Sequence, residues 1–251
     1  MSNLNKTLSF LLICFCYNSC SKNNSTIDQT IITTSRYIIE MSNNYTISKY
    51  SFYDSNDSYA GDGDAISQYL YYQDSIIIIR DCRSVTARGD YAKTIYYINS
   101  NGLADSSLTE SDPGHLSKRF IKNFYSYDNS RFLISDSTIS KEQNGSFLSS
   151  SVLKYEYTDG NMTKLITQYT GSDSYISTYT YNTLENLFSL DGSFKGKPNK
   201  NLVKSVSSLQ YTSTIEYKLY PSGLVEDATS TSYYNSVKYV NKINYQYIIS
   251  D

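Results

Sequence analysis

The chain has 251 residues with 22 basic and 24 acidic side chains, so its formal net charge is −2. This balance disfavours a nucleic-acid partner, because binding to phosphates needs a basic surface. The composition includes 28 tyrosines, no tryptophan and only 3 prolines. Together with abundant serine, threonine and asparagine, it favours strands and turns over helices.

The N-terminal segment predicts export. Its apolar run, Leu8–Cys16, is far shorter than the roughly 20 residues that a membrane helix needs, and it suits the core of a signal peptide. A small residue, Ser19, then directly precedes Cys20, as in a bacterial lipobox, although Tyr17 stands where that motif usually has Leu or Val. We expect residues 1–19 to be a signal peptide, Cys20 to carry a lipid that anchors the chain to a membrane, and residues 20–29 to form a flexible tether. The alternative is ordinary secretion without lipid on Cys20.

Residues 30–251 are expected to form a single Tyr-rich β domain, because strand-like alternation begins near Thr30 and continues to the end. Turn dipeptides and short polar clusters separate the predicted strands. The strands are expected at Thr46–Tyr53, Ile66–Tyr72, Ile76–Cys82, Lys93–Asn99, Phe120–Tyr127, Arg131–Ser140, Leu153–Tyr157, Tyr175–Tyr181, Leu202–Leu209, Ser213–Tyr220, Val225–Tyr233 and Lys238–Ile249.

Three polar stretches predict connections between these strands. Asp54–Asp64 is rich in Asp and Gly and predicts a loop, and Leu103–Lys118 contains a Pro-Gly pair and predicts a long polar connection. Asn182–Asn201 predicts an irregular excursion, in which Leu184–Leu190 has the pattern of one or two helical turns.

The segment around Asp159-Gly160 predicts a β-hairpin. Leu153, Tyr155 and Tyr157 alternate with polar residues, which is the period of a half-buried strand. Asp-Gly tolerates the positive φ angles of a type I′ turn. Folding back over this turn should pair Tyr157 with Met162 and Leu153 with Ile166.

Tyr-x-Tyr pairs recur along the chain, mostly a few residues before a turn, at Tyr69/Tyr71, Tyr125/Tyr127, Tyr155/Tyr157, Tyr179/Tyr181 and Tyr245/Tyr247. Their uneven spacing excludes a strict solenoid or propeller. We therefore predict an all-β fold, an antiparallel meander of about a dozen strands curled into an open barrel or a strongly twisted sheet. Tyrosine in the middle of the apolar faces disfavours a barrel that spans a membrane, because such a barrel places aliphatic residues there.

These hairpins, together with Cys20, resemble those of Bacteroidota lipoproteins that carry an uncharacterised domain with a porin-like β fold. The segment Tyr179–Val206 adds to the likeness, with a Tyr-x-Tyr strand, a loop and a restart of the sheet at Lys200-Asn201-Leu202. The hairpins also resemble the more regular Tyr-Asp repeats of Rhs-type shells. The first resemblance implies an outer membrane lipoprotein. Surface export in this phylum depends on acidic residues just after the lipidated cysteine, and Ser21–Ser25 offers none, so the periplasmic face is favoured over the cell surface.

Two groups of residues are candidate ligand sites. Asp54, Asp57, Asp62 and Asp64 lie near two glycines, and a hard cation such as Ca²⁺ takes several carboxylates on a flexible loop. Their spacing misses the EF-hand pattern, so four solvated acids in a turn are the simpler interpretation. Tyr155, Tyr157, Tyr179 and Tyr181 could stack on sugar rings, although cross-strand packing explains these tyrosines more simply.

The sequence carries no catalytic signature and implies no cofactor. His115 is the single imidazole, and abundant serine does not supply the geometry of a triad. We therefore expect a lipid-anchored envelope protein of binding or scaffold type that recognises a glycan or an envelope protein. The alternatives are a hydrolase of surface polysaccharide, since any two acids can meet in space, and a purely structural component.

Overall fold

The computed structural model describes residues 30–41, 45–53, 59–84, 90–112, 118–187, 193–209, 211–234 and 237–249. These residues form strands joined by short turns, and one short 3-10 helix, η2 (Ser193–Lys195). The strands are β1 (Thr30–Met41), β2 (Tyr45–Tyr53), β3 (Tyr59–Tyr71), β4 (Ser75–Ser84), β5 (Asp90–Ile98), β6 (Ala104–Asp112), β7 (Arg119–Tyr127), β8 (Leu133–Glu142), β9 (Phe147–Thr158), β10 (Asn161–Tyr169), β11 (Tyr175–Glu185), β12 (Asn201–Ser208), β13 (Tyr211–Leu219), β14 (Val225–Tyr234) and β15 (Val237–Ile249).

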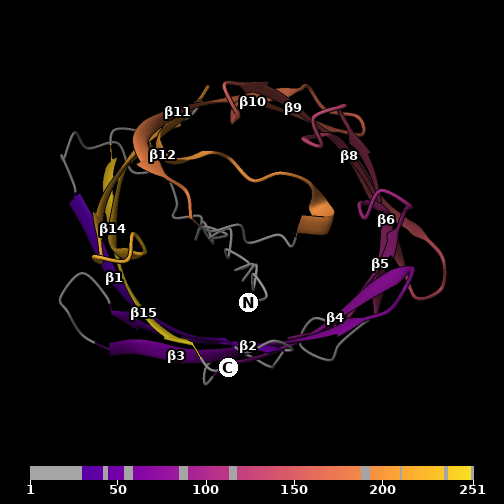
Figure 1. Cartoon of the computed structure of the whole chain (residues 1–251), viewed down its shortest axis with the longest axis horizontal. Helices are drawn as coiled ribbons and strands as arrows, with labels where there is room; N and C mark the ends of the chain where they lie inside the picture. The colour runs from indigo at the N-terminus through magenta and orange to yellow at the C-terminus, as the bar shows by residue number, and fades with distance from the viewer. Residues whose placement is uncertain are drawn as a thin grey trace, which may run out of the picture.

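The strands form one closed barrel (Figure 1). From β1 to β15 each strand pairs antiparallel with the next, which confirms the predicted all-β antiparallel meander. The first and last strands then pair in parallel, from Thr30 beside Lys238 to Met41 beside Ile249. The sheet is therefore closed where we expected an open barrel or a twisted sheet. An up-and-down meander with an odd number of strands brings its first and last strands together in the same direction, so the closing contact has to be parallel.

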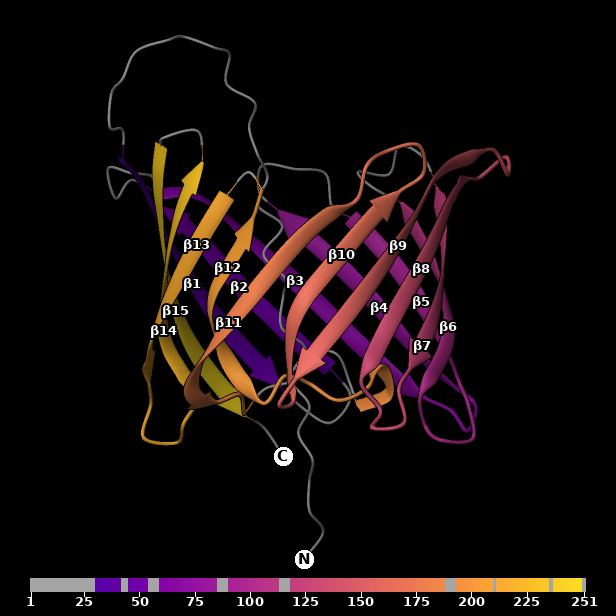
Figure 2. The ribbon, with the colours of Figure 1, turned by 90° about the horizontal axis from the view of Figure 1, so that it is seen from above.

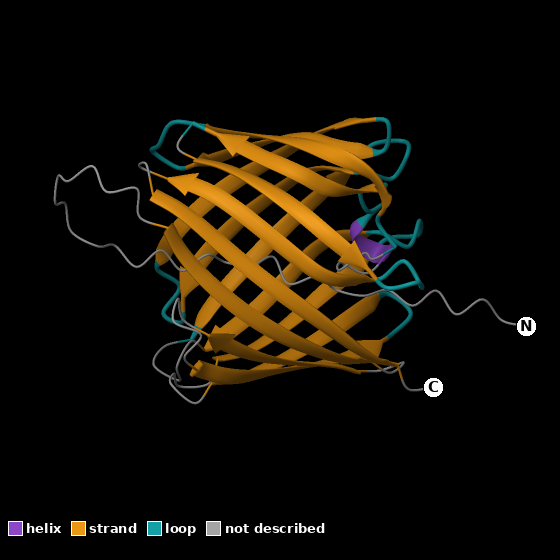
Figure 3. Cartoon of the chain, turned by 90° about the vertical axis from the view of Figure 1, so that its left-hand side faces the viewer, coloured by secondary structure: helices purple, strands orange, loops and turns teal. Residues whose placement is uncertain are grey.

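The strands tilt strongly relative to the barrel axis, as closure of a sheet requires (Figure 3). Barrels of eight strands fill their interior with side chains, whereas barrels of about 16 strands enclose a wide lumen. The fifteen strands here belong to the wide class.

The inner face of the wall is identified by η2, which lies inside the ring of strands (Figure 1). Phe194 of η2 packs in one buried cluster with Ile76, Ala104 and Tyr125. Directly paired residues in a sheet point to the same face. The strand register therefore carries the inner face from these residues around the whole barrel.

Buried apolar side chains gather in two clusters on this inner face. The first lies at η2 and consists of Ile76, Ala104, Tyr125 and Phe194. The second lies across β12, β14 and β15 and consists of Leu202, Val225, Ala228, Ile243 and Tyr245. The apolar core of the described residues is thus divided into two clusters on the barrel wall, which suits a wide barrel.

The hairpin between β9 and β10 has the predicted turn. Asp159 and Gly160 have φ angles of 52° and 82°, as a type I′ turn requires, and Tyr157 pairs with Met162. A bulge between Met162 and Lys164 then shifts the register by one residue. Leu153 consequently pairs with Thr167, and the predicted pairing with Ile166 is wrong.

Two predicted connections are corrected. Most of Leu103–Lys118 is the strand β6, and the second half of Asp54–Asp64 belongs to the strand β3. Both stretches are polar because the inner face of a wide barrel can face water, so a strand there needs no apolar row on that face. Of the predicted helical turns, Leu184 lies in β11, and the described 3-10 helix comes later in the same excursion.

Among the described segments, no helix has the length and apolar character needed to cross a bilayer.

Candidate binding surfaces of the barrel

The Tyr-x-Tyr pairs line the inner face and form what we call the tyrosine belt. Register places its members on the same face as Tyr96 and Tyr125, which contact Phe194. The belt consists of Tyr69, Tyr71, Tyr96, Tyr125, Tyr127, Tyr155, Tyr157, Tyr179, Tyr181, Tyr217, Tyr245 and Tyr247. Most members precede the turns that lie at one end of the barrel, at the bottom of Figure 2, and we call this the strap end.

The four tyrosines predicted to stack on sugars belong to this belt and are half-buried. The ring of Tyr157 lies 4.7 Å from that of Phe132, measured between centroids. The hydroxyl of Tyr181 donates to the carbonyl oxygen of Met162 at 2.6 Å. Tyr155 and Tyr179 lie beside them on neighbouring strands, paired with Leu165 and Val206. These rings are used in cross-strand packing, and stacking on a ligand stays a prediction.

Burial raises the pKa of several phenols of the belt. It raises the pKa of Tyr157 to about 12, with the nearby Asp128 carboxylate adding to the effect. Burial also raises the pKa of Tyr217 and of Tyr247 to about 12. The pKa values of Tyr127 and Tyr181 are raised as well, first by burial and then by neighbouring phenols. At neutral pH these hydroxyls are therefore uncharged donors and acceptors.

A short segment, residues 193–200, crosses the belt from inside the barrel, and we call it the strap. Phe194 is 7 % exposed, and its ring centroid lies 4.8 Å from that of Tyr96. The ammonium of Lys195 lies 5.7 Å from the ring centroid of Tyr96 and 5.8 Å from that of Tyr125. Aromatic packing and cation–π attraction thus hold the strap against the belt.

Backbone hydrogen bonds fix the strap to two hairpin turns. The amide of Lys197 donates to the carbonyl oxygen of Arg131 at 2.9 Å, and the amide of Lys200 donates to that of Gly160 at 2.9 Å. Gly196 has a φ of +100°, and a Cβ placed on it would lie 2.7 Å from the Arg131 oxygen. The strap runs so close against the wall that only glycine fits at this position, and it narrows the lumen at this end.

Short polar side chains line the inner wall next to the belt. Ser107 is fully buried, and its hydroxyl is 2.8 Å from that of Tyr125. Asn123 donates to Ser107 at 3.2 Å and accepts from Thr138 at 2.8 Å. Across the barrel, Ser213 lies 2.9 Å from Ser230, hydroxyl to hydroxyl. These contacts join uncharged groups, and Asp136, which pairs with Tyr125, adds one carboxylate to this part of the wall.

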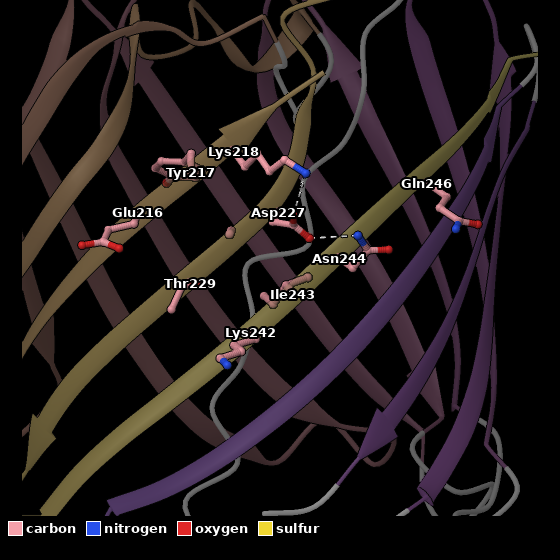
Figure 4. A pocket seen from close by; sticks show the side chains of 10 residues that line it. Glu216, Tyr217, Lys218, Asp227, Thr229, Lys242, Ile243, Asn244 and Gln246 are labelled. Atoms are coloured by element: carbon pink, nitrogen blue, oxygen red, sulfur yellow. Dashed lines mark hydrogen bonds and ion pairs between the residues drawn. The ribbon is translucent and has the colours of Figure 1, made fainter. Parts of the chain in front are cut away.

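The outer wall carries a groove across β13, β14 and β15, with a volume of about 760 Å³ (Figure 4). Register aligns Lys218, Asp227 and Asn244 in one row. The ammonium of Lys218 lies 3.9 Å from Asp227 and 2.7 Å from Glu226, and the amide of Asn244 donates to Asp227 at 2.9 Å. The charges of Lys218 and Asp227 are thus compensated across the strands.

A second pocket, of about 770 Å³, lies at the opposite end of the barrel, where β10 turns into β11. We call it the rim pocket, and that end the rim end. Its lining residues are Ser150, Ser151, Val152, Gln168, Tyr169, Thr170, Gly171, Ser172, Asp173 and Tyr175. This pocket was not predicted, because Tyr169 and Tyr175 do not form a Tyr-x-Tyr pair. A tyrosine on each side of the Gly171 turn was the signal.

Of the remaining predicted site residues, Cys20, Asp54 and Asp57 lie outside the described residues, as does His115. Asp62 and Asp64 lie in β3, where their backbones pair with those of Ser51 and Lys49. The described residues contain no group of three His, Cys, Asp or Glu side chains that could hold a metal ion. The calcium site therefore stays a prediction.

The architecture defines the class of the protein, which is a wide, closed, up-and-down β-barrel. It is similar to the crystal structure of a porin-like protein from Bacteroides uniformis, with a TM-score of 0.50 and 15 % sequence identity. The match covers 83 % of this chain and 91 % of that chain. At this identity the likeness shows the fold. No family model and no curated protein matches the sequence.

Proposed function

We propose that this chain is a lipid-anchored protein of the cell envelope whose barrel binds a glycan. The observation that carries the proposal is the inner wall, which combines tyrosine rings with uncharged hydroxyl and amide groups around a wide lumen. Sugars present both apolar C–H faces and many hydroxyls. Aromatic rings with polar neighbours match both features.

The outer wall from β9 to β13 is mostly polar, which supports a barrel that is anchored by lipid and has water on this side, whereas on β3 to β7 the outer wall exposes Ile66, Tyr97 and Phe124. On the faces of β11 to β13 that point away from the lumen, hydroxyl pairs link the strands, such as Thr180 with Ser205 at 2.7 Å and Ser207 with Thr212 at 3.3 Å. A cross-strand ion pair joins Lys164 and Glu156 at 2.9 Å. A wall in contact with lipid needs an apolar band, and charges within it are costly.

The strap favours binding over conduction. It narrows the strap end, and it is held there by a buried ring and two backbone hydrogen bonds. A barrel that is narrowed at one end is better suited to hold a ligand than to conduct solutes, and we call this shape the cup. An envelope protein that occupies the same cup is the alternative ligand, and the periplasmic face of the outer membrane remains the favoured location.

The anchor is tested by Cys20→Ala. We expect the wild-type protein to fractionate with membranes and to incorporate a radiolabelled fatty acid, and the variant to lose both properties. Retention of the variant in the membrane fraction would contradict the lipid anchor. Cys82→Ser is the control, because the motif places no lipid on Cys82.

Binding is tested by affinity electrophoresis in gels that contain neutral polysaccharides, namely dextran, laminarin, mannan or starch. We expect retardation of the wild-type protein in at least one gel, without release of reducing ends from that polysaccharide. Release of reducing ends would instead support a hydrolase. Neither retardation nor release would leave a structural component as the better description.

A further inference from the structure

The rim pocket has exposed aromatic rings, unlike most of the tyrosine belt. Tyr169 and Tyr175 are 50 % and 51 % exposed, whereas Tyr125 and Tyr245 of the belt are 8 % and 6 % exposed. The two rim rings face each other across the turn, with centroids 6.3 Å apart and an angle of 69° between their planes. An edge-to-face pair stabilises both rings while leaving ring surface open to the solvent.

The turn that carries these rings is fixed on the barrel. Thr170 donates its amide to the carbonyl oxygen of Ser150 at 3.1 Å, and the hydroxyls of the two residues are also hydrogen-bonded. Gly171 provides the positive φ, +79°, that the turn requires. The amide of Ser172 donates back to the carbonyl oxygen of Tyr169 at 3.2 Å. The two rings are therefore held in place before a ligand arrives, which lowers the entropic cost of binding.

The polar lining of the rim pocket is suited to a neutral ligand. Asp173 offers a carboxylate, and Ser151 and Ser172 offer hydroxyls, all of which are exposed or half-buried. Ser151 pairs with Tyr169 and shares its face of the wall, whereas Gln168 lies on the opposite face. The ten lining residues include no Lys or Arg. An anionic polysaccharide would meet a carboxylate without a compensating cation, whereas the hydroxyls of a neutral sugar can donate to Asp173 and both donate to and accept from Ser151.

The outer groove on β13 to β15 lacks this combination. Its charged side chains Lys218 and Asp227 are already satisfied by cross-strand partners, and its single aromatic residue, Tyr217, belongs to the belt on the inner face. Of the two pockets, the one at the rim alone offers exposed rings beside uncommitted polar groups.

We propose that the rim pocket is a neutral-glycan subsite, in which Tyr169 and Tyr175 stack on the C–H faces of sugar residues and Ser151 and Asp173 bind their hydroxyls. This subsite rests on the proposed glycan binding and deepens it. It places the first contact with the sugar chain at the open end of the cup, above the belt.

The experiment compares the wild-type chain with Y169A/Y175A in affinity gels that contain the same four polysaccharides. Where the wild-type protein is retarded, we expect the double variant to lose at least tenfold in affinity, since stacking on aromatic rings is worth about 1–3 kcal/mol per ring in other ligands. Y97A/Y233A is the matched control, because these two tyrosines are 45 % and 52 % exposed but lie outside the pocket. The control should bind like the wild-type protein.

A second variant, Asp173→Ala, keeps both rings and separates hydrogen bonding from loss of folding. We expect it to weaken retardation severalfold with an unchanged urea unfolding midpoint. Equal retardation of Y169A/Y175A and the wild-type protein would overturn the subsite and leave glycan binding standing. Absence of retardation of the wild-type protein in all four gels would overturn both. Loss of binding to phosphatidylethanolamine–phosphatidylglycerol vesicles in Y169A/Y175A, with glycan binding intact, would assign the rings to a membrane surface and also overturn the subsite.

Discussion

The two ends of the barrel use tyrosine differently. At the strap end, Phe194 and Lys195 cover the rings of Tyr96 and Tyr125, and Tyr125 also shares a buried hydrogen bond with Ser107. At the rim end, Tyr169 and Tyr175 make a pair with each other and stay half in the solvent. Tyrosine therefore has a structural role at the strap end, where the strap covers it. At the rim end no described segment lies over the rings of Tyr169 and Tyr175, so these rings are candidate ligand-binding surfaces. Three predictions sharpen this comparison.

The largest expected effect comes from removing the buried ring of the strap. Phe194→Ala deletes a ring that is 7 % exposed, and such deletions in cores typically cost about 3–5 kcal/mol. We expect the urea unfolding midpoint to fall accordingly and the strap amides to exchange hydrogen faster. The matched control is Phe124→Ala, whose ring is 44 % exposed, and it should cost less than about 1 kcal/mol. Equal losses would mean that the strap does not stabilise the belt.

An intermediate effect is expected at Gly196, where the strap approaches the wall most closely. Gly196→Ala adds a Cβ 2.7 Å from the Arg131 carbonyl oxygen, at a φ that disfavours any side chain. We expect a loss of about 2–4 kcal/mol in the free energy of unfolding, combining backbone strain with overpacking. In Gly102→Ala the φ is also positive, +73°, but nothing lies within 4 Å of the new Cβ, so only about 1–2 kcal/mol should be lost. Unfolding of the two variants at the same urea concentration would contradict the close approach of residue 196 to the Arg131 carbonyl oxygen.

The smallest effect is a dependence of stability on alkaline pH. Because burial raises the pKa of Tyr157, Tyr217 and Tyr247 to about 12 in the folded chain, above the roughly 10 of an unfolded one, these phenols favour folding below pH 10. This contribution is lost as the pH rises from about 10 through 12. Unfolding midpoints measured across that range should fall, and Tyr217→Phe should make the fall shallower. A midpoint that rises with pH would contradict burial of the belt.

The hairpin at Asp159-Gly160 illustrates what local sequence can and cannot predict. The turn type and the pairing of Tyr157 with Met162 follow from two residues with positive φ and from alternation, and both are confirmed. The bulge after Met162 was missed, although it shifts every later pair of the hairpin by one residue. Asn199 of the strap contributes to this bulge, because its side-chain oxygen accepts a hydrogen bond from the Met162 amide at 2.7 Å. A contact with a segment so distant in sequence leaves no local signal.

The candidate sites show the same division. Alternation predicted that Tyr155, Tyr157, Tyr179 and Tyr181 share a face, and register confirms this. The rim pair, Tyr169 and Tyr175, stands on the two sides of a turn and shows no period, so only the fold reveals that the rings meet. Strand β6 was missed for a related reason: its residues Ser107 and Thr109 are polar and point inward, where an apolar core would have required a different pattern.

By itself, the sequence determined most of the strands, most of their turns and the rows of tyrosine, because alternation and turn chemistry act between near neighbours in the chain. The tertiary structure decided that β1 and β15 meet, which of the two faces of the wall is inside, and which tyrosines are covered. The physical reason is that alternation distinguishes two faces without saying which one water reaches. In a wide barrel, that assignment depends on closure between the two ends of the sheet and on a strap that joins turns far apart in the sequence.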